Sequence, residues 1–342
     1  MAVKAGALRF NTDSNKLELY DGNQWVEIVA TSPEAQTGGA RGLFGGGYVS
    51  PGSVNTINYI TISTTGNAID FGDLINARRL HGSCSSRTRG LFAGGYKDGS
   101  GTRSEIEYIT ISSTGNGTSF GNISSGAKLA IGSCSNSTRG LFAGGTQDAP
   151  GAAGAGFTNT IEYVTISSTG NGVDFGDLTL AKRPYFCGLS SPTRGIFGGG
   201  ILGPAYTNVI EFVTISTLGN AADFGDLSAT RQAIGQCSNS IRGLFGGGEQ
   251  PTGKVNTIEY ITISSLGNVQ DFGDLTLAKY GMSACSSSTR GVFGAGTLDP
   301  STNNINTIDY VTIMSTGNAI DFGDLLYVVQ QTSALSNGHG GL

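Results

Sequence analysis

The sequence has little charge for its length. Of its 342 residues only 13% are charged, about half the usual share, and the net charge is -5. Because it lacks the basic excess that binds nucleic-acid phosphates, we expect no nucleic-acid partner. Low charge with 38% hydrophobic residues is also unlike a disordered chain. The composition therefore predicts a folded protein, and a chain of this length can bury roughly three quarters of its unfolded surface.

Long apolar runs and helical patterns are missing as well. No apolar run of about 18 residues occurs, so we expect no membrane insertion. The first residues, MAVKAGALRFNTDSNK, lack the apolar stretch of a secretory signal. No segment repeats apolar residues at helical spacing over several turns. The sequence predicts an all-β protein with almost no helix.

Histidine is scarce too. Only His81 and His339 are present, and His339 lies in a tail that looks disordered. A copper centre needs imidazole ligands, and a Ser-His-Asp hydrolase needs a positioned histidine. A sialidase-like site needs clustered arginines with an acid and a tyrosine, whereas the arginines here are spread along the chain. We expect that the protein is not an enzyme and has no cofactor.

What the chain does have is glycine, 56 residues of it, and an internal repeat. Each unit holds four short β-prone stretches separated by Gly, Asn, Ser and Thr, such as RGLFGGG, NTIEYITI, VQDFGDL and MSACSSST. A four-stranded unit of nearly 50 residues, repeated six times, predicts a six-bladed β-propeller. The octet TRGLFAGG occurs twice, at Thr88 and at Thr138, and its Arg-Gly pair stands in all six units, at Arg41, Arg89, Arg139, Arg194, Arg242 and Arg290.

The end of the chain predicts how such a ring closes. The tail QTSALSNGHGGL aligns with GMSACSSSTRGV of the preceding unit, so that Leu335 matches Cys285 and Gly340 matches Arg290. The chain begins its repeat at a second strand, and the tail can supply the missing first strand. We therefore expect the propeller to be closed by the C-terminal strand.

These units resemble the kelch-type β-propellers over residues 35–342. The resemblance rests on an apolar strand that ends in a glycine pair (LFAGG), a Tyr in the third strand (EYITI), and an aromatic residue followed by Leu in the fourth (DFGDL). A basic residue then precedes the next first strand. The usual fourth-strand Trp is replaced by a Phe, which can fill a similar slot between blades: Phe71, Phe120, Phe175, Phe224, Phe272 and Phe322.

The glycine octet and the cysteines both have chemical alternatives. A phosphate loop needs a Lys and a helix after its glycines, and neither follows here, so we interpret the octet as a strand. Cys84, Cys134, Cys237 and Cys285 lie five residues before a repeat Arg, Leu189 and Leu335 hold that place elsewhere, and Cys187 stands two residues earlier. An odd number at repeat spacing, without CxxC, predicts structural free thiols rather than disulfides or a metal site. Free thiols fit folding in a reducing cytoplasm.

Paired carboxylates flank the Phe-Gly of most units. A calcium site needs six to eight oxygens, so two Asp in each unit are too few and we expect no metal. The alternative is that the first Asp pairs with the repeat Arg. For Arg242 that partner is expected to be Asp223 or Asp271.

Residues 1–34 differ from the repeat and predict a three-stranded β-meander, with strands at 7–10, 16–20 and 25–29. So small a sheet buries too little apolar surface to be stable alone, so we expect it to pack on a partner or on its own copies. Its pattern, GALRFNTDSNKLELYDGNQW, resembles N-terminal modules of bacteriophage fibre and appendage proteins. The phrase TISSTGN with DFGDL resembles repeats in virion proteins of marine tailed phages.

Together the resemblances imply a structural protein of the virion surface, with residues 1–34 as anchor and linker and residues 35–342 as propeller. The implied function is that of a tail fibre or receptor-binding component that attaches to a host-cell-surface glycan or protein. Its partners would be other virion proteins through residues 1–34, and copies of itself, a trimer by analogy. A capsid decoration or head-fibre protein is the alternative, and a glycan-processing enzyme is a third.

Binding is expected where the loops depart from the repeat. The loops after the second strand vary in length and chemistry, while the STRG and STGN turns at the other face hardly vary. Aromatic and polar residues together suit a sugar or a peptide epitope. The alternative is that these loops are only tolerated length variation. The candidate ligand-binding residues are Tyr48, Tyr96, Phe157 and Tyr206, with Lys97, Asp98, Arg79 and Arg183 at the same rim.

Overall fold

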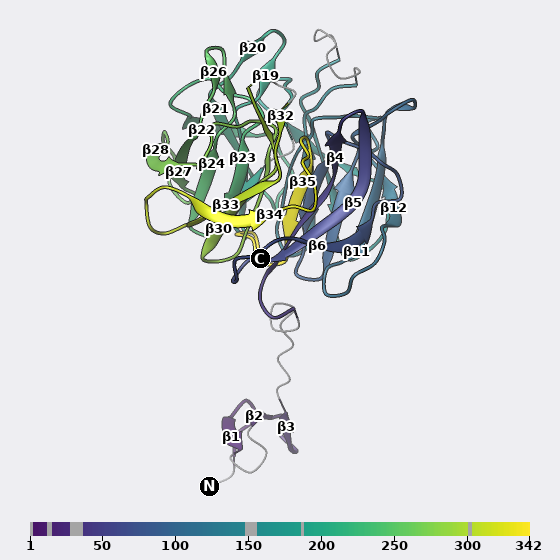
Figure 1. Ribbon diagram of the computed structural model, residues 1–342. Coiled ribbons are helices and arrows are strands. Elements are labelled where there is room, and N and C mark those ends of the chain that lie inside the picture. Colours follow the sequence, from purple (N-terminus) through teal and green to yellow (C-terminus); the bar gives the residue numbers. More distant parts are fainter. Residues whose placement is uncertain (1–2, 12–15, 28–36, 148–155, 186–187, 300–302) are drawn as a thin grey trace.

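The computed structural model describes residues 3–11, 16–27, 37–147, 156–185, 188–299 and 303–342. These residues form strands and no helix, as the missing helical period predicts (Figure 1). They contain no helix with the length and hydrophobicity to cross a bilayer. Six of their sheets have four antiparallel strands each. The described chain is therefore all-β, with an arrangement of sheets that is consistent with a propeller-like fold.

We number the four-stranded sheets 1 to 6 and give each from its first strand to its fourth. Sheet 1 holds β35 (Ser333–Ser336), β4 (Arg41–Val49), β5 (Gly52–Thr61) and β6 (Ile69–Asp73). Sheet 2 holds β7 (Gly82–Ser85), β8 (Arg89–Ala93), β11 (Glu105–Thr110) and β12 (Thr118–Asn122). Sheet 3 holds β13 (Gly132–Ser135), β14 (Arg139–Ala143), β15 (Thr160–Thr165) and β16 (Val173–Asp177).

Sheets 4 to 6 repeat this order. Sheet 4 holds β17 (Leu189–Ser190), β18 (Arg194–Gly198), β21 (Val209–Thr214) and β22 (Ala222–Asp226). Sheet 5 holds β23 (Gly235–Ser238), β24 (Arg242–Gly246), β27 (Thr257–Thr262) and β28 (Gln270–Asp274). Sheet 6 holds β29 (Ser283–Ser286), β30 (Arg290–Gly294), β33 (Thr307–Thr312) and β34 (Ile320–Asp324).

Short two-stranded hairpins extend the loops after the second strands. In sheet 1, β4 and β5 themselves continue into this hairpin, with Val49 opposite Gly52. The other hairpins are β9 (Tyr96–Lys97) with β10 (Gly101–Thr102), β19 (Ile201–Leu202) with β20 (Ala205–Tyr206), β25 (Glu249–Gln250) with β26 (Gly253–Lys254), and β31 (Thr297–Leu298) with β32 (Asn303–Asn304).

Sheet 1 joins the two ends of the repeat region. In the β35–β4 pair Leu335 lies opposite Leu43, as Cys285 lies opposite Val292 in sheet 6, which confirms the expected alignment of the tail. The hydrogen bond that closes the turn between the first and second strands is also present in sheet 1, although its two strands come from opposite ends of the repeat region. The Asn337 Oδ1 accepts a hydrogen bond from the Arg41 N–H at 2.8 Å, as the Asn239 Oδ1 does from Arg242 at 2.7 Å.

The core lies between neighbouring sheets. Leu43 and Phe71 of sheet 1 share one buried cluster with Phe92 of sheet 2. The fourth-strand Phe takes this place between sheets, as expected, and its ring meets the third-strand Tyr of its own sheet edge-on, with the Tyr59 and Phe71 centroids 6.0 Å apart. Apolar burial between sheets is therefore repeated along the chain.

The recurrent STGN turn fastens each sheet to the fourth strand of the sheet before it. The Asn116 Oδ1 accepts a hydrogen bond from the Asp73 N–H at 3.0 Å, and five equivalent asparagines do the same. Beside this bond Gly72 has φ +142°, and a Cβ there would lie 2.5 Å from the Gly115 carbonyl oxygen. The glycine of DFGD is therefore required by the close approach of two backbones.

The N-terminal residues form a separate three-stranded antiparallel sheet of β1 (Leu8–Asn11), β2 (Lys16–Tyr20) and β3 (Trp25–Glu27). The predicted meander is present, with strand ends that differ by one or two residues. Figure 1 shows this sheet apart from the six larger ones. The predicted boundary between residues 34 and 35 falls in 28–36, outside the described residues, so the division into two domains stays a prediction.

Candidate functional site

One face of the molecule is built where the loops after the second strands meet the segments after the fourth strands. Isolated bridges join the two at each sheet: Tyr48 with Gln330, Arg79 with Tyr96, Leu129 with Thr146, Arg183 with Ile201, Gln232 with Glu249, and Tyr280 with Thr297. These are the loops that vary between repeats. We call this surface the loop face, and the opposite surface, which carries the STRG and STGN turns, the turn face.

Arg79 is the centre of one cluster on the loop face. Its guanidinium carbon lies 4.4 Å from the ring centre of Tyr48 and 5.3 Å from that of Tyr96. Its Nη2 is 3.3 Å from the Asp98 Oδ1. The Asp98 Oδ2 accepts a hydrogen bond from the Ser53 N–H at 2.6 Å. Four predicted residues from neighbouring sheets 1 and 2 are thus brought together.

Charge and burial in this cluster favour a fixed arrangement. Burial alone would raise the pKa of Asp98, but the hydrogen bond from Ser53 and the charge of Arg79 outweigh it and lower that pKa. The side chain of Arg79 is 15% exposed and that of Asp98 42%. Tyr96 also packs against the buried cluster of Leu80, Leu129 and Ala130, which holds its ring in place.

The other predicted residues lie in separate contacts. The Lys97 Nζ donates to the Asn76 Oδ1 at 2.7 Å. Arg183 lies over the Phe157 ring at 4.7 Å, and the Tyr206 hydroxyl donates to the Glu249 Oε2 at 3.3 Å. The predicted rim residues therefore lie in four separate groups of contacts. The four aromatic residues among them are partly buried, not fully exposed as the loop sequences suggested.

Residues of the same face were missed by sequence reasoning. Gln232 donates to the Tyr206 hydroxyl oxygen at 3.0 Å, and Lys254 lies 4.9 Å from the ring centre of Tyr280. Gln232 and Tyr280 hold the repeat position that Arg79 holds in sheet 2. Comparing this position across all units of the sequence could have predicted Gln232 and Tyr280.

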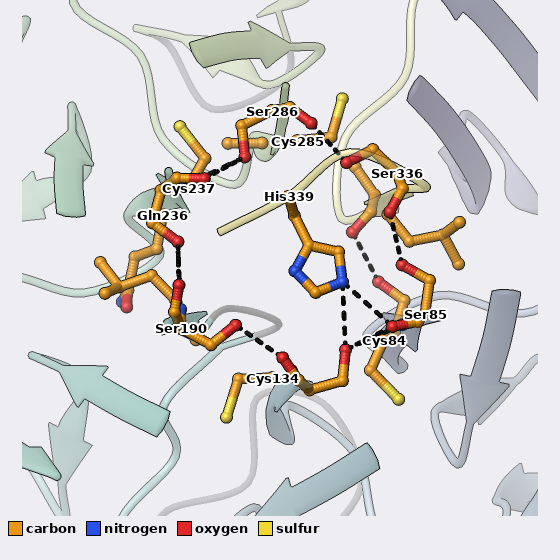
Figure 2. Close-up of a pocket in the computed structure, with 18 of the residues that line it drawn as sticks. Cys84, Ser85, Cys134, Ser190, Gln236, Cys237, Cys285, Ser286, Ser336 and His339 are labelled. Atoms are coloured by element: carbon orange, nitrogen blue, oxygen red, sulfur yellow. Dashed lines mark hydrogen bonds between the residues drawn. The ribbon is translucent and has the colours of Figure 1, made fainter. Parts of the chain in front are cut away.

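A small cavity of about 50 Å³ lies among the first strands and is lined by their serines and cysteines (Figure 2). Each first strand has a serine directly after the Cys or Leu position, and its hydroxyl donates to a serine carbonyl of the preceding sheet. The sequence repeats this serine in every unit, a signal that our cysteine search passed over. The bonds run Ser85 to Ser336, Ser336 to Ser286, Ser286 to Ser238, Ser238 to Ser190, Ser190 to Ser135 and Ser135 to Ser85, at 2.5 to 2.8 Å.

The C-terminal residues enter this cavity from the turn face. Figure 2 shows the His339 ring among the first strands, with its Nε2 3.0 Å from the Ser85 carbonyl oxygen. Its Nδ1 accepts a hydrogen bond from the Gly341 N–H at 3.1 Å, so the proton belongs on Nε2. Burial lowers the pKa of His339 to about 4, which keeps the ring neutral. The expectation of a disordered tail was wrong, because His339 lies in this cavity and hydrogen-bonds to the first strands.

At the loop end of the first strands, backbone hydrogen bonds link neighbouring units. Residues just before the first strands have left-handed φ values, such as 58° at Leu80 and 56° at Ala130. The Ala130 N–H donates to the Leu80 carbonyl at 2.7 Å, and similar bonds link Tyr185 to Ala130, Leu80 to Gln331, Gln331 to Gly281 and Gly281 to Ala233. These bonds join neighbouring units at the loop end of the first strands, whereas the C-terminal residues lie at their turn end.

Cys84, Cys134 and Cys285 are buried free thiols, as predicted, and Cys237 is buried as well; Cys187 lies outside the described residues. Burial raises the pKa of Cys134 and Cys285, so these thiols stay protonated. The Cys84 sulfur faces Gly140 of sheet 3, where a Cβ would lie 2.5 Å from it. The glycine of each Arg-Gly pair thus makes room for the Cys or Leu of the neighbouring sheet, which explains why the octet repeats it.

The expected pairing of the repeat Arg with an Asp is wrong. Among the described residues no ion pair joins Arg242 to Asp223 or Asp271. The Arg242 guanidinium lies 4.1 Å from the ring centre of Tyr260 and donates to the Ile313 carbonyl at 3.0 Å. The carbonyls that end a third strand attract the cation more closely than a solvated carboxylate on the fourth strand does.

The basic residue that precedes the first strand is instead the one that forms an ion pair, with a buried carboxylate of the third strand. The Lys182 Nζ is 2.6 Å from the Glu211 Oε1, and the Lys279 Nζ is 3.0 Å from the Asp309 Oδ2. Arg78 with Glu107 and Arg231 with Glu259 form the same pair in sheets 2 and 5. In sheet 3, burial lowers the pKa of Lys128 and the charge of Glu162 opposes that shift. In sheet 1 the two positions hold Val329 and Asn58.

No protein-family model and no curated protein matches this chain. In the described ranges no group of three or more His, Cys, Asp or Glu side chains is placed to hold a metal ion. The site must therefore be argued from its own geometry.

Proposed function

We propose that the chain is a closed six-bladed β-propeller of the kelch type, carried on the surface of a bacteriophage particle, whose loop face attaches the particle to a host glycan or protein. The closure is supported by the serine hydroxyl bonds, which lead from sheet to sheet and return to Ser85. It is supported also by β35, which pairs with β4 in the register of the other first strands.

The observation that carries the binding proposal is the cluster of Arg79 with Tyr48, Tyr96 and Asp98. It is made by loops that differ between repeats, whereas the turn face repeats its chemistry almost unchanged. Rings held by a cation present a stacking surface at little cost in side-chain freedom. We propose that this cluster binds the receptor and that the protein acts by binding rather than catalysis.

Virion attachment is proposed for residues 1–34. Support comes from the resemblance of this segment to phage fibre modules and from the start of β4 at Arg41, which lies at the turn-face end of that strand, away from the proposed receptor site. The tail is the proposed location, and the capsid is the alternative. Antibody labelling of purified particles, imaged by electron microscopy, distinguishes the two.

The binding test uses the purified protein on host cells and on a glycan array. The double variant Tyr48→Ala/Tyr96→Ala is expected to lose at least about tenfold in affinity, because two ring contacts are removed. The matched control is Tyr108→Ala, which removes a ring beneath Arg89 at the opposite end of sheet 2. Equal binding by the Tyr48/Tyr96 variant and the native protein contradicts the proposed receptor site.

A further inference from the structure

Residues 338–341 fill the turn-face mouth of the cavity among the first strands. The Gly340 N–H donates to the Ser238 carbonyl at 2.9 Å, and the His339 Nε2 lies 3.0 Å from the Ser85 carbonyl oxygen. We call residues 338–341 the plug and the backbone around them the socket. The socket is built from all six sheets or the turns that adjoin them, in sheet order by Ala40, Ser85, Ser135, Ser190, Asn239 and Ser287.

The fit of the plug requires glycine at two positions. A Cβ at Gly340 would collide with the carbonyl oxygens of Ser190 and Asn239, and a Cβ at Gly341 would collide with that of Ser135. Backbone oxygens cannot rotate away as the end of a side chain can, so even alanine would push the plug out. The socket is therefore shaped for a segment that has no side chains at these two positions.

His339 is held in its neutral form by hydrogen bonds to both ring nitrogens. Its Nε2 donates to the Ser85 carbonyl and lies 3.3 Å from the Ser135 Oγ. Its Nδ1 accepts a hydrogen bond from the Gly341 N–H at 3.1 Å. A second proton, on Nδ1, would remove that acceptor and place two donors face to face. The plug therefore fits the socket as long as the imidazole is uncharged.

The groups around His339 offer no counter-ion to a protonated ring. The described residues that line the cavity and its mouth include no Asp or Glu. They include a second cation, Arg87, whose Nη2 donates to the Leu342 main-chain oxygen at 3.1 Å. Burial lowers the pKa of His339 to about 4, and the charge of Arg87 adds to that effect. A protonated His339 would be a buried charge without a partner. The other titratable side chains of this lining are the thiols of Cys84, Cys134, Cys237 and Cys285.

We infer that the socket is a binding site for a glycine-rich segment with one neutral histidine, that the plug occupies it reversibly, and that acid weakens this binding. The plug can leave by itself, because the residues before it are held separately. The Asn337 Oδ1 accepts a hydrogen bond from the Arg41 N–H, and β35 pairs with β4. Release of the plug opens the mouth of the cavity on the turn face. This inference does not depend on the receptor proposal, which concerns the loop face.

The direction of the pH effect follows from the two states of His339. In the released plug the histidine has its ordinary pKa of about 6.5, whereas burial lowers the pKa of the bound histidine to about 4. The released plug therefore takes up a proton that the bound plug does not, so binding is strongest above pH of about 6.5 and weakens as the pH falls toward about 4. Between pH of about 7.5 and about 5 the equilibrium constant for binding is expected to fall about 30-fold.

The test is amide hydrogen exchange of Gly340 and Gly341 in the intact protein, measured by NMR over this pH range and divided by the rates of an unstructured peptide. Both amides are expected to be protected at neutral pH, because both donate hydrogen bonds. Their protection is expected to be weaker than that of Ser333–Ser336, because the plug opens without the sheet, and to fall about 30-fold by pH of about 5. Equal protection at the two ends of the pH range overturns the inference. So does exchange at neutral pH that is as slow as in Ser333–Ser336 or as fast as in the unstructured peptide.

Two variants separate His339 from other effects of acid. His339→Gln keeps one donor and one acceptor but does not titrate, so the protection of Gly340 and Gly341 is expected to stay nearly constant over the same pH range. Gly341→Ala is expected to abolish the protection of Gly340 already at neutral pH, while the melting transition of the sheets remains. A fall of native size in the His339→Gln protein, or native protection in the Gly341→Ala protein, contradicts the inference.

Discussion

Sheet 1 and sheet 6 have the same strand order and register but differ at one buried pair. In sheet 6, Lys279 meets Asp309 in a fully buried ion pair, and burial lowers the pKa of that lysine. In sheet 1, Val329 and Asn58 occupy the same places. The Asn58 Oδ1 still accepts a hydrogen bond from the Leu326 N–H at 3.2 Å, as the buried carboxylates accept bonds from the preceding sheet. Both partners have changed together.

Comparing the two sheets shows which interaction of this buried pair the fold needs. A buried charge without its partner is costly, whereas a pair replaced by uncharged groups can be nearly neutral. The link between neighbouring sheets is kept in sheet 1 and the charge is not. We conclude that the inter-sheet hydrogen bond is the structural requirement and that the ion pair is one way to supply it.

Sheet 1 differs in a second way, since its first strand comes from the far end of the chain. Deletion of residues 333–342 is expected to have the largest effect, because it exposes the edge of β4 and leaves the neighbouring first strands without partners. The expected result is loss of the cooperative thermal transition, followed by circular dichroism. Deletion of residues 339–342 is the control and is expected to preserve the transition, because it removes His339 but keeps β35.

The ion-pair comparison can be tested by converting sheet 6 to the residues of sheet 1. Lys279→Val alone or Asp309→Asn alone is expected to cost about 3–5 kcal/mol of unfolding free energy, because each disrupts a buried pair. The double variant is expected to cost less than either single variant. Denaturant unfolding of the four proteins measures the coupling. Additive losses contradict the account of the paired change.

The packing of Cys84 on Gly140 offers a smaller test that applies to every sheet. Gly140→Ala places a Cβ 2.5 Å from the Cys84 sulfur and is expected to cost about 1–3 kcal/mol through overpacking. Cys84→Ala removes that sulfur, so the double variant is expected to recover part of the loss. Unfolding curves recorded with and without a reducing agent should coincide, because the described cysteines are free thiols.

We expect His81 to make sheet 2 more sensitive to acid than sheets 3, 5 and 6, which have no histidine at this position. Burial, with help from the charge of Arg78, lowers the pKa of His81 well below its usual value. The unfolded chain therefore binds a proton that the folded chain does not, and stability is lost as the pH falls below about 6.5. Ile131, Ile234 and Met282 hold this position elsewhere.

The corresponding variant is His81→Met, which copies sheet 6. Its melting temperature is expected to fall less than that of the native protein between neutral pH and pH of about 5, where an unfolded histidine is mostly protonated. The variant His339→Ala is expected to reduce the loss of stability in acid in the same way, because burial lowers the pKa of His339 as well. Identical acid profiles for His81→Met and the native protein count against a contribution from His81.

Much of the fold could be predicted because short stretches of sequence are enough to recognise each repeat and its strands. The alignment of Leu335 with Cys285 gave the register of β35, and alternation around Tyr260 gave a strand covered on both faces. The sequence does not show which side chain crosses to which sheet. That is why Arg242 was paired with an Asp instead of the Ile313 carbonyl.

The loop face was less predictable than the sheets. Tyr48, Arg79 and Tyr96 lie far apart in sequence, and their grouping depends on how two neighbouring sheets are placed. The path of His339 was hidden for a related reason. The tail follows the repeat through Asn337 and then turns into the cavity among the first strands, where hydrogen bonds hold it.

The most direct test of the central claim, that the last strand completes sheet 1, is amide hydrogen exchange on the intact protein. The segment Ser333–Ser336 is compared with Ser283–Ser286, the equivalent strand of sheet 6. We predict equally slow exchange in both, at the rate set by global unfolding, because both are first strands of the same assembly. Exchange of Ser333–Ser336 as fast as that of an unstructured peptide would contradict the claim.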